Sequence, residues 1–574
     1  MKNKLGILVS ILLITALLLS ACGGDQLKPA ESLAQGDETT VAAAQSETTQ
    51  GVSQAPAEPQ KATPSVLRIG ITREPDSTSP FIATLSSHEI IDNHIYDDLM
   101  EYDDDLNIVG GLAKDWTVSE DGLVWTFNLK EGIKWTDGED FTADDVVWTY
   151  NALINEEYPQ SVQLSGITKA EKVDDYTVKI YTDQPKADME GIRISIMPEH
   201  IYKDKSLEDL HTFAEELPVG TGPYKLVEWE QGQYLKFVAN KDYFGGTPQV
   251  DELVYVVFAN ADTQMSALTT GEIDAATSVV NNQIPMLEQN PDIEVVKALG
   301  VRFTELGFNC WDDPQSKGNP LILDPKIRVA ADYAIDKEKI VKIALNGLGT
   351  TGTSMIPPAT GVWHWDPGEE EHKFDPEKAK QILEEAGYTD KDGDGIREDA
   401  AGNKLDFRFA VITSYGEAYV KAAGIIQKNL QDIGINTTIN TMDGGAQSDL
   451  IYEQDFNTDM YLWGWSAELD PSLKLSVMLT EQVGKRSDCF WSNPAYDELY
   501  TKQVHQIDKA ERIKTVHQMQ KLIYDEAPYI ILYNRNAIEA YRTDKFEGWT
   551  KVPSKIGTTI TQVNKSNFLS VKPK

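Results

Sequence analysis

Residues 123–146, LVWTFNLKEGIKWTDGEDFTADDV, predict the local structure of this chain more clearly than any other stretch. Apolar side chains occupy every second position from Leu123 to Leu129, which is typical of a strand with one buried face. Glu131-Gly132 marks a turn. Thr142 stands where a helix cap is needed, with acidic residues directly after it. A strand, a turn and a helix in this order predict a mixed α/β fold.

Strands and helices are expected to alternate along the rest of the chain. The apolar runs 224–229 and 234–238 flank a polar turn and predict a hairpin. Asp375-Pro376-Glu377 combines a cap, a proline and an acid, so a helix should begin there. Further helices are expected over about 417–432 and 493–525.

Six segments together resemble the peptide- and nickel-binding solute receptors of bacterial ABC importers, and they follow one another in the order expected of that family. The segments are Gly111–Trp116, Trp125–Leu129, Lys134–Val146, Gly220–Leu226, Asp324–Asp336 and Phe374–Ala379. The resemblance implies two lobes that close around a ligand, with an extra inserted domain. It implies a first lobe from 66–109, 220–301 and 535–574, an inserted domain at 110–219 and a second lobe at 302–534. Strands near Phe303–Asn309 and Tyr529–Tyr533 would form the hinge.

The N-terminus resembles a bacterial lipoprotein signal. A basic start, an apolar run and Leu19-Ser20-Ala21 precede Cys22, and the run is short for a membrane span. We expect a signal peptide over 1–21 and a lipid on Cys22. Residues 22–65 contain no aromatic side chain and are expected to be a disordered tether. The protein would sit on the outer face of the cell membrane, or in the periplasm if the cell has an outer membrane.

Composition excludes some partners. The chain has 574 residues, 91 of them acidic and 52 basic, with a formal net charge of −39. Such a surface repels nucleic acid, so no nucleic-acid partner is expected, and we expect a monomer. Cys310 and Cys489 remain beside Cys22; they could pair or stay as free thiols, and free thiols are preferred.

No catalytic motif is apparent, so we do not expect an enzyme. In the peptide receptors that this chain resembles, an aspartate three positions after a tryptophan pairs with the ligand's α-ammonium. Here Trp465 is followed at that distance by Glu468, a departure that brings the peptide ligand into question. Glu468, Trp463, Trp465 and Asp470 are the predicted ligand-binding residues, with the alternatives that Glu468 is a surface acid or that Asp470 is the functional one.

Asp390, Asp392 and Asp394 begin a loop that resembles an EF-hand, but Ala401 stands where a bidentate glutamate should close it. A structural calcium ion is one interpretation and a tight Asp/Gly turn is the other. No other cofactor is expected.

These observations favour a lipid-anchored extracellular receptor that passes peptides to an ABC permease. The alternatives are a receptor for a nickel chelate, a sugar or another small solute, a receptor that signals without import, and a secreted hydrolase.

Overall fold

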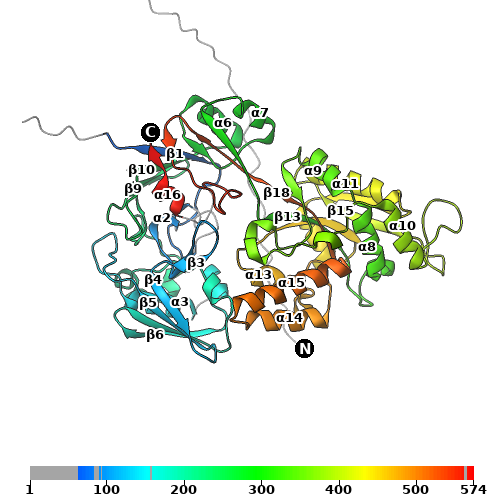
Figure 1. Cartoon of the computed structure of the whole chain (residues 1–574), viewed down its shortest axis with the longest axis horizontal. Helices are drawn as coiled ribbons and strands as arrows, with labels where there is room; N and C mark the ends of the chain where they lie inside the picture. The colour runs from blue at the N-terminus through cyan, green and yellow to red at the C-terminus, as the bar shows by residue number, and fades with distance from the viewer. Residues whose placement is uncertain (1–62, 83–89, 92, 155–157, 561–564) are drawn as a thin grey trace, which may run out of the picture. The chain divides into compact units, whose positions relative to one another are not determined.

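In the computed structural model of this chain, strands that are distant in sequence come together in three large sheets (Figure 1). The structure describes residues 63–82, 90–91, 93–154, 158–560 and 565–574. All of them belong to the unit Thr63–Lys574. Among them, none of the helices combines the length and the apolar character that crossing a membrane requires.

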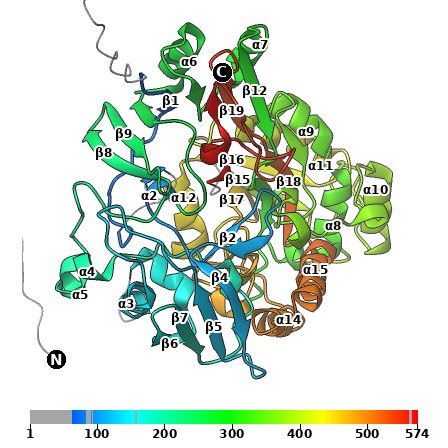
Figure 2. The same cartoon turned by 60° about the vertical axis from the view of Figure 1, so that its left-hand side comes forward.

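The seven-stranded sheet draws on the beginning, the middle and the end of the described chain. Its order is β12(Ile293–Ala298), β19(Ala537–Arg542), β11(Ala275–Ala276), β1(Val66–Ile71), β10(Glu252–Val257), β9(Tyr234–Ala239) and β8(Tyr224–Glu230). In Figure 2, blue β1, green β8 and β9 and red β19 therefore lie in one region. β1 pairs in parallel with β10 and β11, and β8 and β9 form the expected hairpin.

The six-stranded sheet comes from the second half of the chain. Its order is β14(Gly349–Thr351), β18(Tyr529–Arg535), β13(Arg302–Phe308), β17(Met460–Ser466), β15(Asp406–Ile412) and β16(Asn436–Met442). β13 is antiparallel to both of its neighbours. Apolar side chains of four helices, α8 to α11, join one core with this sheet, and those of α13 to α15 join another. The interior strands β13 and β18 are thus buried on both faces.

The four-stranded sheet contains the stretch that the sequence predicts most clearly. Its order is β4(Ala113–Val118), β5(Val124–Leu129), β7(Thr177–Thr182) and β6(Ile167–Asp174). Trp125, Phe127 and Leu129 are buried as the alternation predicts. Two small sheets complete the list: β2(Met100–Tyr102) with β3(Ile108–Gly110), and β20(Phe546–Glu547) with β21(Lys572–Pro573).

Helices connect these strands, and most of the longer ones have a side-chain cap. The α-helices are α2(Asn93–Ile95), α3(Ala143–Ile154), α4(Glu199–Tyr202), α5(Leu207–Leu210), α6(Ala261–Thr270), α7(Ile284–Leu287), α8(Pro325–Ala334), α9(Lys337–Ala344), α10(Pro376–Glu385), α11(Glu417–Gln431), α12(Gly444–Ser448), α13(Ser472–Ser476), α14(Pro494–Val504), α15(Lys509–Glu526) and α16(Ser566–Ser570). Short 3-10 segments are η2(Pro159–Leu164), η3(Met189–Gly191), η4(Asn281–Gln283), η5(Pro320–Leu323), η6(Pro358–Trp363), η7(Gly368–Glu370) and η9(Thr480–Gln482), and η8(Asp449–Glu453) is a π turn.

The helix expected over 493–525 is in fact two helices, α14 and α15. The carboxylate of Asp508 accepts a hydrogen bond from the backbone N–H of Glu511 at 3.0 Å, which starts α15 with its own cap. A capping aspartate inside an otherwise continuous pattern is the signal that the prediction overlooked. The expected helix start at Asp375 is confirmed, since its side chain accepts from the N–H of Lys378 at 2.9 Å.

Candidate functional site

The chain crosses between the seven-stranded and the six-stranded sheet at two places. β12 ends at Ala298 and β13 begins at Arg302; β18 ends at Arg535 and β19 begins at Ala537. The two crossing segments touch, because a Cβ on Gly300 would lie 2.0 Å from the carbonyl oxygen of Arg535. The strands expected to form the hinge are interior strands of the six-stranded sheet, and the crossing residues lie at their ends.

A cavity of about 470 Å³ lies at this crossing, and we call it the crossover cavity. Its walls come from both sheets: Thr72 and Arg73 follow β1, while Ser466 ends β17. Arg302 and Arg535, which begin and end the crossing strands of the six-stranded sheet, complete its charged lining together with Glu539. Glu539 already accepts hydrogen bonds from the backbone N–H groups of the segment Thr559–Ile560. The cavity is therefore basic in a strongly acidic protein.

Two predicted site residues, Trp463 and Trp465, lie on β17, and Ser466 at the end of this strand lines the cavity. Both are half-buried. The indole N–H of Trp465 donates to Asp488 at 3.3 Å. The ammonium of Lys474 lies 4.2 Å from the centre of the Trp465 ring, close enough for a cation–π contact. Trp465 is thereby held in one orientation, whereas Trp463 packs beside the cluster that contains Tyr461.

Glu468 is exposed, and within the described chain its carboxylate has no hydrogen bond or ion pair. Its charge is felt by Lys474: burial lowers the pKa of that ammonium, and Glu468 opposes the shift. Glu468 lies two residues after Ser466, which lines the crossover cavity, and one residue before Leu469, which lines a second cavity. The exposed carboxylate is thus free to receive a cationic group, although Glu468 itself lines neither cavity.

The second cavity, of about 520 Å³, lies between the four-stranded sheet and α15, and we call it the tryptophan cavity. Trp116, Trp125 and Trp363 contribute to its walls. The indole N–H of Trp116 donates to Glu190 at 3.0 Å. These large rings suit apolar side chains of a ligand, while charged residues such as Glu190 and Lys509 line other parts of the cavity.

Asp470, another predicted ligand residue, has a strong partner inside the protein. Arg512 donates to its two carboxylate oxygens at 2.8 and 2.9 Å, and the backbone N–H of Ser472 donates at 2.9 Å. Arg512 also donates to the carbonyl oxygen of Ala187 at 3.1 Å. This pair fixes the segment 466–470 on α15 and connects it to the loop after the four-stranded sheet.

Two buried acids that no sequence motif marks lie beside the tryptophans: Glu305 on β13 and Asp488 in the segment before α14. Burial raises the pKa of Asp488 to about 7, and Tyr529 donates its hydroxyl to this carboxyl group. Burial also raises the pKa of Glu305, whose two side-chain oxygens have no partner in the described structure. Glu305 faces Trp463 across the β13–β17 ladder. The raised pKa values favour the neutral forms of both carboxyl groups, which lowers the cost of burying them.

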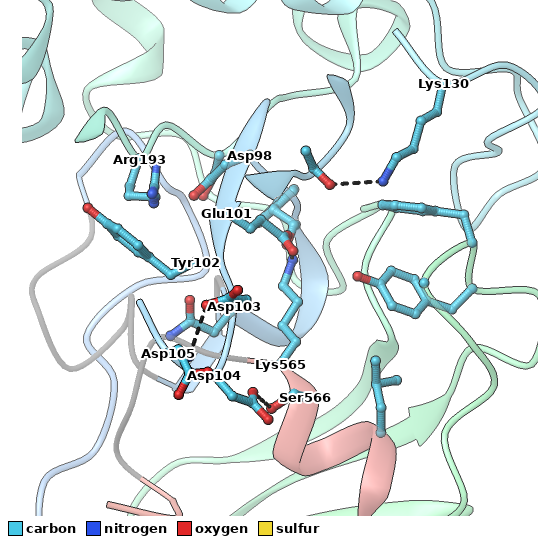
Figure 3. Close-up of a pocket in the computed structure, with 18 residues that line it drawn as sticks. Asp98, Glu101, Tyr102, Asp103, Asp104, Asp105, Lys130, Arg193, Lys565 and Ser566 are labelled. Carbon is cyan, nitrogen blue, oxygen red and sulfur yellow. Dashed lines mark hydrogen bonds and ion pairs between the residues drawn. The ribbon is translucent and has the colours of Figure 1, made fainter. Parts of the chain in front are cut away.

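A third cavity, of about 450 Å³, is lined by the acids Asp98, Glu101 and 103–105, and we call it the acidic pocket (Figure 3). Lys565 reaches into it and pairs with Asp97 and Glu101. Lys130 donates to the carbonyl oxygen of Gly110 at 3.0 Å. No described residue of the six-stranded sheet lines this pocket. It adjoins the tryptophan cavity, because Tyr102 and Asp105 line both, and the predicted site residue Asp470 lines the tryptophan cavity.

The Asp/Gly loop holds a cation of its own. Lys404 pairs with Asp392 and Asp394. Asp390 accepts hydrogen bonds from the backbone N–H groups of Gly393 and Gly395, as in a tight turn. Asp390, Asp392 and Glu398 can bring carboxylate oxygens within 4.8 Å of one another, so Glu398 joins this cluster in place of Asp394.

The predicted lipidation residue Cys22 lies outside the described residues. Cys310 and Cys489 are free thiols. The backbone N–H of Cys310 donates to the carbonyl oxygen of Cys489 at 2.9 Å, so the two residues are neighbours.

Comparison with known proteins identifies the fold. Residues 107–485 match the bacterial extracellular solute-binding proteins, family 5. The oligopeptide-binding protein AppA of Bacillus subtilis is 29% identical over 540 residues, which cover 92% of this chain and 93% of that protein. Its structure in complex with a nonapeptide is similar with a TM-score of 0.66 at 26% identity, over 89% of this chain and 100% of that chain.

A solved structure of NikZ from Campylobacter jejuni with Ni(L-His) has the same fold, with a TM-score of 0.68 at 24% identity. It covers 88% of this chain and 99% of that chain. The resemblance predicted from the sequence is confirmed, and so is the α/β fold class of two-lobed binding proteins. The predicted domain boundaries and site residues stay predictions.

Proposed function

This chain belongs to the bacterial extracellular solute-binding proteins of family 5, and we propose that it captures peptides between its two lobes and delivers them to a membrane ABC importer. The family consists of solute-binding receptors and is not an enzyme family. A lipid on Cys22 would tether the receptor to the outer face of the cell membrane. The similarity to AppA of Bacillus subtilis, solved with a nonapeptide, supports the peptide as ligand.

The observation that carries this proposal is the position of Glu468. Its exposed carboxylate has no partner among the described residues, and Glu468 lies two residues after Ser466, which lines the crossover cavity. A free peptide brings an α-ammonium, and an ion pair with hydrogen bonds is a strong anchor for it. The rings of the tryptophan cavity would then receive apolar side chains. Glutamate in place of aspartate moves the anchor by one methylene group.

The peptide is preferred to a nickel chelate because of the donor groups present. The described residues that line the crossover cavity include no histidine or cysteine, the side chains that bind nickel best. A chelate would have to be held through its organic part alone. Peptide binding is reversible in this proposal, and lobe closure is favoured because the ligand contacts both sides.

Calorimetry with two matched peptides tests the proposal. Tetraalanine should bind the native protein, and N-acetyl-tetraalanine, which lacks the charged amine, should bind more weakly. Glu468→Gln should weaken tetraalanine binding about tenfold and leave the acetylated peptide within about twofold. Glu338→Gln, an exposed acid on α9, is the matched control. Equal affinity for both peptides would contradict the role of Glu468 as the anchor of the amine. Hydrolysis of either peptide would contradict a receptor that binds without cleaving.

A further inference from the structure

We infer that Asp488 is a positioning residue of the ligand site: it holds the ring of Trp465 and, by taking up or releasing one proton, sets how strongly Lys474 engages Glu468. The inference rests on the proposed function, because it takes Trp465 and Glu468 to be parts of the peptide site. It adds a dependence of peptide affinity on pH near neutrality.

Asp488 reaches Trp465 from inside the protein. Its side chain is fully buried and accepts hydrogen bonds from the indole N–H of Trp465 at 3.3 Å and from the hydroxyl of Tyr529. Asp488 precedes α14, whereas the two donors lie on β17 and β18, so one carboxyl group joins three segments of the chain. A ring that is held by its N–H meets a ligand in one orientation, which lowers the entropic cost of binding.

Lys474 covers the face of the same ring. Its ammonium lies 4.2 Å from the ring centre, and the residue is only 5% exposed. Among the described residues, no carboxylate lies within ion-pair distance of this ammonium. Three acids nevertheless favour its charged form, Glu468 at the surface and Glu305 and Asp488 in the interior. The charge of Lys474 is therefore shared between an exposed carboxylate and two buried carboxyl groups.

The two buried acids do not carry two charges at neutral pH. Burial and the neighbouring charge of Asp488 raise the pKa of Glu305 well above its usual value, and neither oxygen of Glu305 has a partner in the described structure. Glu305 therefore keeps its proton. Burial also raises the pKa of Asp488 to about 7, so this carboxyl group is the one that changes its charge near neutrality. Like charges at close range separate two titrations in this way.

The other groups around Asp488 keep their charge in this range. Its remaining titratable neighbours in the described structure are Tyr452 on η8, Tyr461 on β17, Tyr529 on β18 and Cys489. Burial raises the pKa of Tyr452, Tyr461 and Cys489, so these groups stay neutral, and Tyr529 donates its hydroxyl to Asp488. Arg486 acts on Lys474, and an arginine is charged throughout this range.

The direction of the effect follows from these charges. Above about pH 7, Asp488 has released its proton to solvent and balances the ammonium of Lys474, so the full charge of Glu468 is available to the amine of a peptide. Below this pH, Asp488 is neutral and Glu468 alone balances the ammonium. The amine of the ligand then competes with Lys474 for one carboxylate, and its affinity falls.

Calorimetry with tetraalanine at about pH 5.5 and about pH 7 measures this effect, because the amine of the peptide stays mostly protonated over that interval. The native protein should bind about two- to fivefold more weakly at the lower pH. Asp488→Asn keeps the shape and stays neutral, so at both pH values it should bind as weakly as the native protein does at the lower one. Lys474→Met removes the competing ammonium and should bind at both pH values at least as tightly as the native protein does near pH 7.

Two further variants complete the test. Glu305→Gln keeps a neutral group beside Asp488, so the pH dependence should persist; its loss would assign the proton to Glu305 and overturn the inference. Asp432→Asn changes an exposed aspartate directly after α11 and is the matched control, which should follow the native protein. Native protein that binds equally at both pH values, or Asp488→Asn with the native pH dependence, would also overturn the inference.

A measurement without ligand separates this inference from the proposed function. In protein labelled with 15N-tryptophan, the indole N–H resonance of Trp465, identified by its loss in Trp465→Phe, should shift with a midpoint near pH 7 and should not shift in Asp488→Asn. If no peptide binds but this titration is seen, peptide capture fails and the positioning role of Asp488 stands. If peptides bind but the resonance does not titrate, or titrates equally in Asp488→Asn, the positioning role fails.

Discussion

Replacing Arg512 by methionine should destabilise the protein by about 3–5 kcal/mol, the cost of leaving one member of a buried ion pair alone. Arg512 is only 3% exposed, and methionine keeps much of its volume. The substitution would leave the carboxylate of Asp470 without its cationic partner. It would also release the segment 466–470, which carries the predicted anchor Glu468, from α15.

The magnitude follows from the number of bonds that Arg512 makes. Its guanidinium donates twice to Asp470, and once each to Ser472, Gln503 and Ala187. Five bonds match the five N–H donors of arginine. Removing Asp470 as well, in a variant with Asp470→Leu and Arg512→Met, should cost less than the sum of the single changes, by about 2 kcal/mol.

The loss should depend on pH in a defined direction. Burial by itself raises the pKa of Asp470, but the charge and hydrogen bonds of Arg512 outweigh it and lower the pKa below the usual value. A carboxylate with a lowered pKa stabilises the fold above its unfolded pKa of about 3.9, and this contribution disappears as the pH falls through the folded pKa. Without Arg512, burial dominates and protonation becomes favourable. The difference between native protein and variant is therefore largest at neutral pH and shrinks below about pH 4.

Urea unfolding followed by tryptophan fluorescence, at neutral and acidic pH, measures these differences. Lys521→Met is the matched control, because Lys521 lies on the same helix, is 43% exposed and pairs with Glu370 and Asp525 at the surface. It should cost less than about 1 kcal/mol. The reasoning is refuted if Arg512→Met costs no more than this control, or if the difference grows on acidification.

Three further predictions concern the remaining features. Lys404→Gln should increase calcium affinity at least about tenfold in calorimetry, because it frees Asp392 and Asp394 from their ammonium partner; native protein that binds calcium equally well would contradict this. Burial raises the pKa of both Cys310 and Cys489, and Cys489 is fully buried, so a thiol reagent should modify Cys489 only after unfolding; rapid modification of Cys489 in the folded protein would contradict this. Cys22→Ala should move the protein from the membrane fraction of cells to the soluble fraction, and an unchanged distribution would exclude the lipid anchor.

The helices and strands that could be predicted from the sequence are those whose signals lie within a few consecutive residues. The alternation from Leu123 to Leu129, the cap at Asp375 and the hairpin at 224–238 can be recognised locally because periodicity and capping act over a few residues. The pairing of β1 with β10 and β11 joins residues about two hundred positions apart, and no local pattern specifies it. The resemblance implied that a lobe is assembled from distant segments, but it gave no strand order for the sheets.

The site was predictable only where one segment carries it. Trp463, Trp465, Glu468 and Asp470 stand within eight residues and were found together. Arg535 and Arg73 are far from them in sequence and meet only at the crossing of the sheets. The pairing of Asp470 with Arg512 could not be predicted either. Arg512 lies on α15, which the sequence pattern does not separate from α14. What decides whether an acid is free or paired is tertiary structure, which places Arg512 against Asp470 and leaves Glu468 open.

Native mass spectrometry of the protein, purified from cells without unfolding, tests reversible peptide capture most directly. The account predicts complexes with a range of added masses that fit short peptides, which leave intact on mild activation and are replaced by added tetraalanine. A single metabolite or metal of constant mass, unaffected by tetraalanine, would contradict it.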